Sequence, residues 1–146
     1  MIKNKAMDKS NQAIVDRFFA ALGKQDLNGI RDVMAENVKW HFMGRHPYAG
    51  VKSGFQEVID FFNTMAKLMG TAKPTIEKPI ISENENHLIE CVHTKANRPD
   101  GITLDHFAAV LWTFSNGKII EGRHFFADPE AVDNYFNAVS EVERKL

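Results

Sequence analysis

Three ionisable residues in the second half of the chain, Glu90, Asp105 and His124, stand in segments that are otherwise apolar and aromatic. An imidazole titrates near neutral pH, and small changes in its surroundings move it across that range. A carboxyl group held in an apolar pocket suits the work of a general acid or base. The sequence therefore predicts acid–base chemistry, with these three side chains as the candidate catalytic residues.

Each candidate also has a purely structural interpretation. His124 fits equally well as a core histidine bonded to a neighbouring hydroxyl or carbonyl group. Glu90 would face solvent or a partner chain if its strand were displaced by one residue. Asp105 would serve only as a partner for asparagine side chains or backbone amides at the rim of the fold.

No pattern in the sequence predicts a metal ion or a cofactor. The six histidines show no HExxH spacing and no other compact ligand set. The single cysteine, Cys91, excludes a disulfide within the chain and a cysteine-based zinc cage. Ser53 is explained by helix capping, and neither residue has the neighbours of an activated nucleophile.

The composition is that of one globular domain. The chain has 146 residues, a formal net charge of −1 and no basic stripe, which argues against nucleic acid as a partner. Its longest apolar run, Phe107 to Trp112, is far shorter than the roughly 20 residues of a membrane span. The segment from Met1 to Gln12 is polar and has no signal-peptide core. We expect residues 1–10 to be flexible and residues 11–146 to form a single cytoplasmic domain.

Helices are predicted where apolar residues recur at three- and four-residue steps. These segments are Asn11 to Gly23, a short stretch after Asp26, Ser53 to Gly70, and a final helix from Pro129. Asp26 and Asp128 are candidate N-caps. Ser53 and Gln56 have the spacing of a capping box.

The candidate catalytic residues belong to the predicted strands, which cover residues 38–43, 75–82, 87–96 and 102–114 and a last strand after Asn116-Gly117. Pro74 and Pro79 place the strand 75–82 at a sheet edge. Asn116-Gly117 predicts a two-residue type I′ hairpin turn. The order of the elements predicts an α+β fold, with the helices on one face of a curved antiparallel sheet.

The hairpin turn sets a register for the last two strands. In a two-residue loop Ser115 pairs with Lys118, and the same register places His124 opposite Ala109. Extending it across the preceding turn, we favour the pairing of Glu90 with Ala109, so that Glu90, Ala109 and His124 form one row. A slip by one residue would instead bring a different set to this face: Cys91, His93 and Lys95.

Three stretches have the order and spacing of a known family. The first, Ile14 to Phe42, contains Phe-Phe-Ala-Ala-Leu; the second runs from Trp40-His41-Phe42-Met43-Gly44 to Gly54; the third is Asn116 to Glu121, followed by Phe126 and Asp128. Together they resemble the cone-shaped fold shared by nuclear transport factor 2, ketosteroid isomerase and the SnoaL-like polyketide cyclases. The resemblance implies a pocket between the concave sheet face and the helices, and often a homodimer through the convex face.

Matching the hairpin turn to the isomerase implies that Gly122, His124 and Phe126 face the pocket. The isomerase's tyrosine and base correspond to Phe18 and Phe42 here, and neither can exchange a proton, so standard ketosteroid isomerisation is not expected. The expected pocket lining is Phe18, Trp40, Phe42, Phe62, Phe107, Ala109, Gly122 and Phe126. Arg98, in a turn, could meet a polar substrate group but is expected to be solvated.

The resemblance favours a cofactor-independent isomerase, lyase, cyclase or epoxide hydrolase acting on an apolar small molecule. The alternative is a non-catalytic protein of the same fold that binds a small ligand, and a third interpretation is a protein-interaction module like nuclear transport factor 2. A homodimer is predicted because an apolar set is expected on the convex face. This set is Val110, Trp112, Phe114, Ile119 and Phe125.

Overall fold

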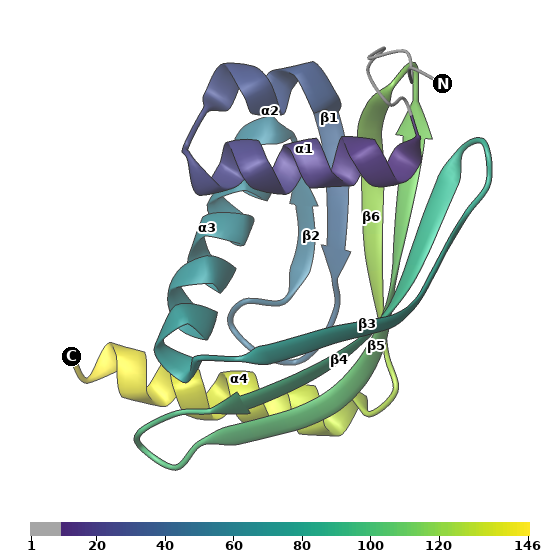
Figure 1. Ribbon diagram of the computed structural model, residues 1–146. Coiled ribbons are helices and arrows are strands. Elements are labelled where there is room, and N and C mark those ends of the chain that lie inside the picture. The colour runs from purple at the N-terminus through teal and green to yellow at the C-terminus, as the bar shows by residue number, and fades with distance from the viewer. Residues whose placement is uncertain (1–9) are drawn as a thin grey trace.

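The computed structural model describes residues 10–146 as four helices and one six-stranded sheet (Figure 1). The predicted flexibility of residues 1–10 falls almost wholly on residues 1–9, which lie outside the described residues. The helices are α1 (Asn11–Gly23), α2 (Leu27–Val33), α3 (Phe55–Ala72) and α4 (Pro129–Arg144). The strands are β1 (Met34–Phe42), β2 (Gly50–Ser53), β3 (Thr75–Glu83), β4 (His87–Asn97), β5 (Thr103–Ser115) and β6 (Lys118–Phe126). No helix in residues 10–146 is long and apolar enough to cross a membrane.

The sheet is curved and carries its helices as the sequence predicts. Its strand order is β2-β1-β6-β5-β4-β3, with β1 and β6 parallel and every other neighbouring pair antiparallel. In Figure 1 the long strands β3, β4 and β5 bend toward the side of the sheet on which α1 and α3 lie. β3 is an edge strand, as its prolines predict.

The helix ends follow the predicted capping at two of three places. Asp26 and Asp128 accept hydrogen bonds from the backbone N–H groups of Gly29 and Ala131. The predicted Ser53 cap of α3 is wrong, because the N-cap is Gly54, whose φ of 93° needs a glycine. The same helix continues past Gly70 to Ala72.

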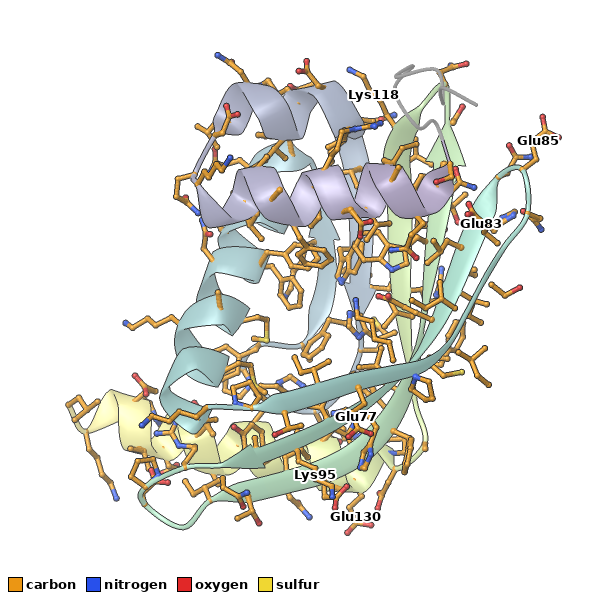
Figure 2. The ribbon with its side chains drawn as sticks, viewed as in Figure 1. Glu77, Glu83, Glu85, Lys95, Lys118 and Glu130 are labelled. Atoms are coloured by element: carbon orange, nitrogen blue, oxygen red, sulfur yellow. The ribbon has the colours of Figure 1, made fainter. Side chains whose placement is uncertain are left out.

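The start of α1 is fixed to the turn between β3 and β4. The backbone N–H of Asn11 donates to Glu83 over 2.8 Å, and its side-chain amide donates to the carbonyl of Asn84 over 2.7 Å. Figure 2 shows Glu83 beside this end of α1, while Glu85 points away from the turn. These contacts hold the β3–β4 hairpin over the side of the sheet that the helices cover.

The hairpin between β5 and β6 has the predicted turn but not the predicted register. Asn116 and Gly117 both have positive φ, at 52° and 75°, as a type I′ turn requires. Phe114 then pairs with Ile119, but Thr113 pairs with Glu121, so Ile120 is an extra residue. This β-bulge shifts every later pair by one position.

Because of this bulge, the side chains of β5 on the concave face of the sheet are those that were predicted to lie on its convex face. His124 pairs with Val110, not with Ala109, and Glu90 on the other side of β5 also pairs with Val110. Both predicted pairings were therefore wrong by one residue on the same strand. The two errors cancel for β4 and β6, so Glu90 and His124 still share one row across three strands.

Candidate functional site

A cavity of about 240 Å³ lies between the concave face of the sheet and the helices. Most of its wall is aromatic and aliphatic, and its polar side chains come mainly from the sheet. The full lining is Phe19, Trp40, Phe42, Phe61, Phe62, Met65, Met69, Ile76, Lys78, Glu90, Val92, Thr94, Leu104, His106, Ala108, Val110, Trp112, His124, Phe126 and Phe136.

Four of the eight predicted binding residues line this cavity: Trp40, Phe42, Phe62 and Phe126. Phe18 does not reach it. It is fully buried behind the wall, where its ring meets those of Phe62 and Trp112 at 5.0 and 6.1 Å. Gly122 is on the predicted face, but the ring of Trp40 covers its Cα and separates it from the cavity.

Three predicted site residues, Asp105, Phe107 and Ala109, lie on the opposite, convex face of the sheet. They alternate along β5 with the cavity residues His106, Ala108 and Val110, so the one-residue shift at the bulge accounts for all three corrections.

The surroundings of Asp105 and Phe107 confirm that they are outside the cavity. Phe107 is 54% exposed. Asp105 contacts His93 on the same face, with 2.6 Å between His93 Nε2 and the Asp105 carboxylate. The hydrogen bond to His93 lowers the pKa of Asp105. Asp105 therefore belongs to a surface pair and cannot meet a ligand in the cavity.

Glu90 reaches the cavity, as the favoured register predicts, and is only 3% exposed. Trp112 Nε1 donates a hydrogen bond to Glu90 Oε1 over 3.1 Å. Lys78 Nζ lies 3.0 Å from Glu90 Oε2 and forms an ion pair with it. A buried carboxylate is costly unless it is paired, and these two side chains supply a hydrogen bond and an opposite charge.

His124 lies in the cavity wall among aromatic rings. Its ring centroid is 5.0 Å from that of Phe42, 5.7 Å from that of Trp40 and 5.7 Å from that of Phe126. Burial, together with nearby His106, lowers the pKa of His124 to about 3. The imidazole is therefore neutral at physiological pH, and its Nε2 is buried without a hydrogen-bond partner.

Two polar lining residues, His106 and Lys78, were missed at the sequence level. Burial lowers the pKa of His106, and its Nδ1 is buried without a hydrogen-bond partner. The alternation of side chains along β5 would have placed His106 in the cavity if the bulge had been known, because the same one-residue shift moves Asp105 to the convex face. Lys78 belongs to an edge strand whose side chains were not assigned to a face.

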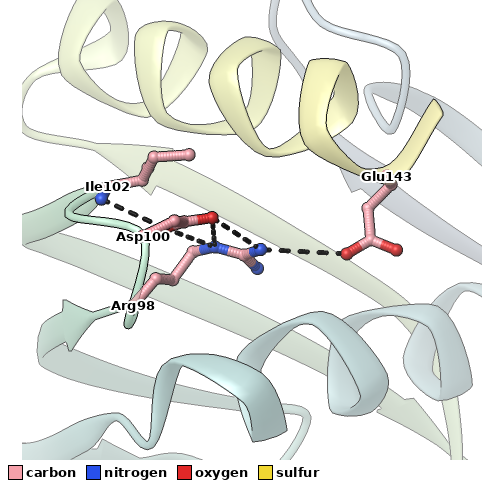
Figure 3. Close-up of polar contacts among 4 residues, drawn as sticks. All are labelled: Arg98, Asp100, Ile102 and Glu143. Carbon is pink, nitrogen blue, oxygen red and sulfur yellow. Dashed lines mark hydrogen bonds and ion pairs between the residues drawn. The ribbon is translucent and has the colours of Figure 1, made fainter. Parts of the chain in front are cut away.

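Arg98 is not the solvated turn residue that the sequence predicts. It is 6% exposed, and Nε and Nη2 contact the carboxylate of Asp100 at 3.2–3.3 Å (Figure 3). Its Nη2 also lies 3.9 Å from Glu143 on α4. Arg98 thus joins the β4–β5 turn to α4 and is not among the cavity-lining residues.

Within residues 10–146, no three His, Cys, Asp or Glu side chains gather closely enough to hold a metal ion. The polar groups of the cavity-lining side chains are one carboxylate, one ammonium, two neutral imidazoles, the hydroxyl of Thr94 and the indole N–H groups of Trp40 and Trp112. Such a set can hold and exchange protons with a small molecule.

Comparison with known proteins agrees with this geometry. A solved structure of Bal32a, from a soil-derived mobile gene cassette, matches with a TM-score of 0.72 at 25% identity, covering 88% of this chain and 99% of that one. An NTF2-like protein from Burkholderia xenovorans matches with a TM-score of 0.71 at 23% identity, over 89% and 100% of the two chains. The fold is therefore NTF2-like, as the resemblance predicted.

At the level of sequence, an uncharacterised protein of Mycobacterium tuberculosis is 31% identical over 130 residues, which cover 88% of this chain and 98% of the relative. Residues 15–122 match the pattern of the SnoaL-like domain. That segment includes most of the cavity wall and Glu90, whereas His124 lies two residues beyond its end. The chain belongs to the SnoaL-like domain family.

Proposed function

We propose that this protein binds a small, mainly apolar molecule in the cavity and that Glu90 and His124 exchange protons with it without a cofactor. One observation carries the proposal: a paired, buried carboxylate and a neutral imidazole share one row of the sheet inside an aromatic cavity. Apolar pockets with a few convergent polar groups of perturbed pKa are typical of active sites.

The size of the cavity limits the ligand. The cavity volume is about 240 Å³. This lies just below the range of about 300–1,000 Å³ typical of small-molecule sites. The eight aromatic side chains of the lining favour a flat ligand of one or two rings.

The two polar residues can act at different positions of such a ligand. Glu90 carries a carboxyl group with one hydrogen-bond partner and one ion-pair partner, and such a group can serve as a general base. His124 is neutral and can donate or accept a hydrogen bond. Two strand spacings of about 4.8 Å separate their backbones, so a ligand can lie between them. A carboxylate that accepts a proton, beside a neutral imidazole that binds the polar group of the ligand, suits the acid–base chemistry of an isomerase, lyase, cyclase or epoxide hydrolase.

The proposal is tested by comparing the binding of naphthalene and 2-naphthol, which differ by one hydroxyl group, by isothermal titration calorimetry. The wild type is expected to bind both and to prefer 2-naphthol. His124→Phe and Glu90→Gln are expected to bind naphthalene as before and to lose part of the preference for 2-naphthol. His87→Gln, a change at an exposed histidine outside the cavity, is the matched control. Absence of saturable binding by the wild type would refute the proposal.

A non-catalytic ligand-binding protein is the second candidate, and the state of Glu90 favours it. Both carboxylate oxygens already have partners, Trp112 and Lys78, so Glu90 could serve only to hold these side chains in place. This function predicts that the preference for 2-naphthol is unchanged in Glu90→Gln and His124→Phe. An unchanged preference would show that neither side chain contacts the hydroxyl group of the ligand, as this second function expects.

A further inference from the structure

The cavity opens to solvent between α1 and β3. Three of its lining residues are exposed: Phe19 on α1 at 39%, Ile76 on β3 at 53%, and the side chain of Lys78 on β3 at 36%. The other lining residues are buried or half-buried. In Figure 1, α1 lies above β3, and β1 and β2 are seen between them. The three exposed side chains therefore form the mouth of the cavity.

Lys78 extends from the mouth toward the interior. Its Nζ lies 3.0 Å from Oε2 of Glu90, whose side chain is only 4% exposed, and the two form an ion pair. The same Nζ lies 5.6 Å from the ring centre of Phe19, within the range of a cation–π contact. The ammonium group is thus committed to two partners, one inside the cavity and one on the opposite side of the mouth. The lysine side chain therefore lies across the mouth, from β3 to α1.

The backbone at Lys78 is less restrained than the central strands of the sheet. β3 is an edge strand, so only β4 pairs with it. The regular pairing of β3 with β4 is interrupted between Glu77 and Ile80, at the place that Lys78 and Pro79 occupy. A proline has no N–H to donate to the ladder. Solvent-exposed, interrupted hydrogen bonding permits local motion, so Lys78 is anchored on a part of the sheet that can move.

The closed and open positions of Lys78 differ in the partners that they leave to Glu90. With the mouth closed, Glu90 has the ion pair and a hydrogen bond from Nε1 of Trp112 at 3.1 Å. When Lys78 swings toward solvent, the hydrogen bond remains but the opposite charge is lost. The closed position is favoured, because a buried carboxylate without an opposite charge is costly. The side chain of Lys78 is partly exposed, so water replaces the lost contact of its ammonium group and side-chain motion is enough to open the mouth.

We propose that Lys78 is the gate of the cavity: its side chain closes the mouth while it is paired with Glu90, and it moves toward solvent whenever a ligand enters or leaves. The inference rests on the proposed function, since it concerns the same cavity, and it adds a regulation of access. Salt weakens an ion pair that is partly exposed, so ligand exchange is expected to become faster as the ionic strength rises. The gate closes over the empty and the occupied cavity alike, so it changes the rates of entry and exit together and leaves the affinity unchanged.

The experiment measures the entry and exit rates of naphthalene, an uncharged ligand, by stopped-flow fluorescence of Trp40 and Trp112, which line the cavity. Lys78→Met keeps a long side chain without the charge, and both rates are expected to rise about fivefold, the scale of one partly exposed ion pair. The dissociation constant should stay within about twofold of the wild-type value. Lys78→Arg keeps the charge and should exchange naphthalene at the wild-type rates. Added salt should speed exchange in the wild type but not in Lys78→Met.

Further variants make the result specific. Glu90→Gln removes the other partner of the ion pair and should raise both rates as Lys78→Met does. The double variant should be no faster than either single variant, because the same contact is lost in all three. Lys95→Met removes an exposed lysine of β4 that lies outside the cavity, labelled in Figure 2, and should change nothing. If Lys78→Met does not fold, Lys78→Gln replaces it, with the same expected increase.

The possible failures are distinguishable. If the wild type binds naphthalene but Lys78→Met leaves both rates unchanged, or changes the exit rate alone, the inference is overturned and ligand binding still stands. It is also overturned if the effects of Lys78→Met and Glu90→Gln multiply in the double variant, because the two side chains then act separately. If the wild type does not bind naphthalene, the proposed function fails and the inference fails with it.

Discussion

The indole ring of Trp40 on β1 covers the backbone of Gly122 on the parallel strand β6. The two residues are paired in the sheet, and a Cβ atom at position 122 would lie 1.9 Å from Cζ3 of the indole. Trp40 is 1% exposed, and its ring contacts those of Phe62 and Trp112, each at 4.8 Å between centroids. The absence of a side chain at Gly122 therefore sets the position of one wall of the cavity.

Gly122→Ala is expected to displace Trp40 and to destabilise the protein. Overpacking a filled core typically costs about 1–3 kcal/mol. The measurement is thermal unfolding followed by tryptophan fluorescence, with a lower Tm expected, together with weaker binding of naphthalene. Gly70→Ala is the matched control, because a Cβ at this helical position meets no atom within 4 Å. That variant should be neutral or more stable by up to about 1 kcal/mol. Equal Tm values for the two variants would contradict the assigned packing.

Local sequence signals predicted most of the fold, because caps, turns and apolar periodicity act over a few residues. The helix Asn11–Gly23, the caps at Asp26 and Asp128 and the turn at Asn116-Gly117 are all confirmed. The incorrect prediction of the N-cap of α3 also comes from a local signal. Ser53 has capping-box spacing, but its backbone N–H donates to the Glu57 carboxylate at 2.6 Å, and its side chain does not cap the helix.

The sequence could not predict which face of β5 points into the cavity, because both faces of this strand carry apolar side chains. Trp112 and Val110 are buried on one face, and Phe107 is exposed on the other. A strand of this kind gives no hydrophobic alternation with which to detect a slip of one residue. The slip depends on Ile120, which is extra in the ladder but reads as an ordinary strand residue. Glu90 and His124 therefore line the cavity as predicted, whereas on β5 the cavity residue is His106 and not the predicted Asp105.

Stability is expected to fall as the pH falls from about 6.5 toward 3, partly because of His124. Its pKa of about 3 is below the ordinary value of 6.5. Between these values the unfolded chain binds a proton that the folded chain does not, so acid favours unfolding. In His124→Phe the loss of unfolding free energy between about pH 7 and about pH 4.5 should be smaller by about 1–3 kcal/mol.

Urea unfolding of the wild type and His124→Phe at these two pH values checks the prediction. His106 and His46 also have lowered pKa values, caused mainly by burial, so the variant should keep part of the acid sensitivity. The exposed-site variant His87→Gln should behave like the wild type. If His124→Phe and the wild type lose the same stability, the imidazole of His124 is not desolvated in the folded protein.

Arg98→Met is expected to loosen the β4–β5 turn from α4. The substitution removes the contacts that the guanidinium group of Arg98 makes with Asp100 and Glu143 (Figure 3). A hydrogen bond to a charged group contributes about 1.5–3 kcal/mol, which sets the expected loss in unfolding free energy. Hydrogen exchange should increase in Ile102 and in the last turns of α4. Glu143→Gln should have the smaller effect, because its contact with Arg98 is 3.9 Å long. An equal or larger effect of Glu143→Gln would contradict this assignment.

The convex face of the sheet carries a different apolar surface from the one that the sequence predicts. Val110, Trp112, Phe114 and Ile119 are buried in the core, and of the predicted set only Phe125 is exposed, at 50%. A row of four paired residues crosses the face next to exposed Phe107. The row is Ile80, Cys91, Ala109 and Phe125.

A homodimer through this convex surface remains a prediction, because exposed apolar patches on a sheet commonly mark interaction sites. Sedimentation velocity at micromolar concentration should show a dimer for the wild type. Phe125→Asp should give a monomer, since it places a charge at the end of the apolar row. Leu27→Gln changes an exposed apolar residue of α2 and should leave the dimer intact. A wild-type protein that sediments only as a monomer would refute the prediction. If Phe125→Asp still forms a dimer, the interface lies on another face.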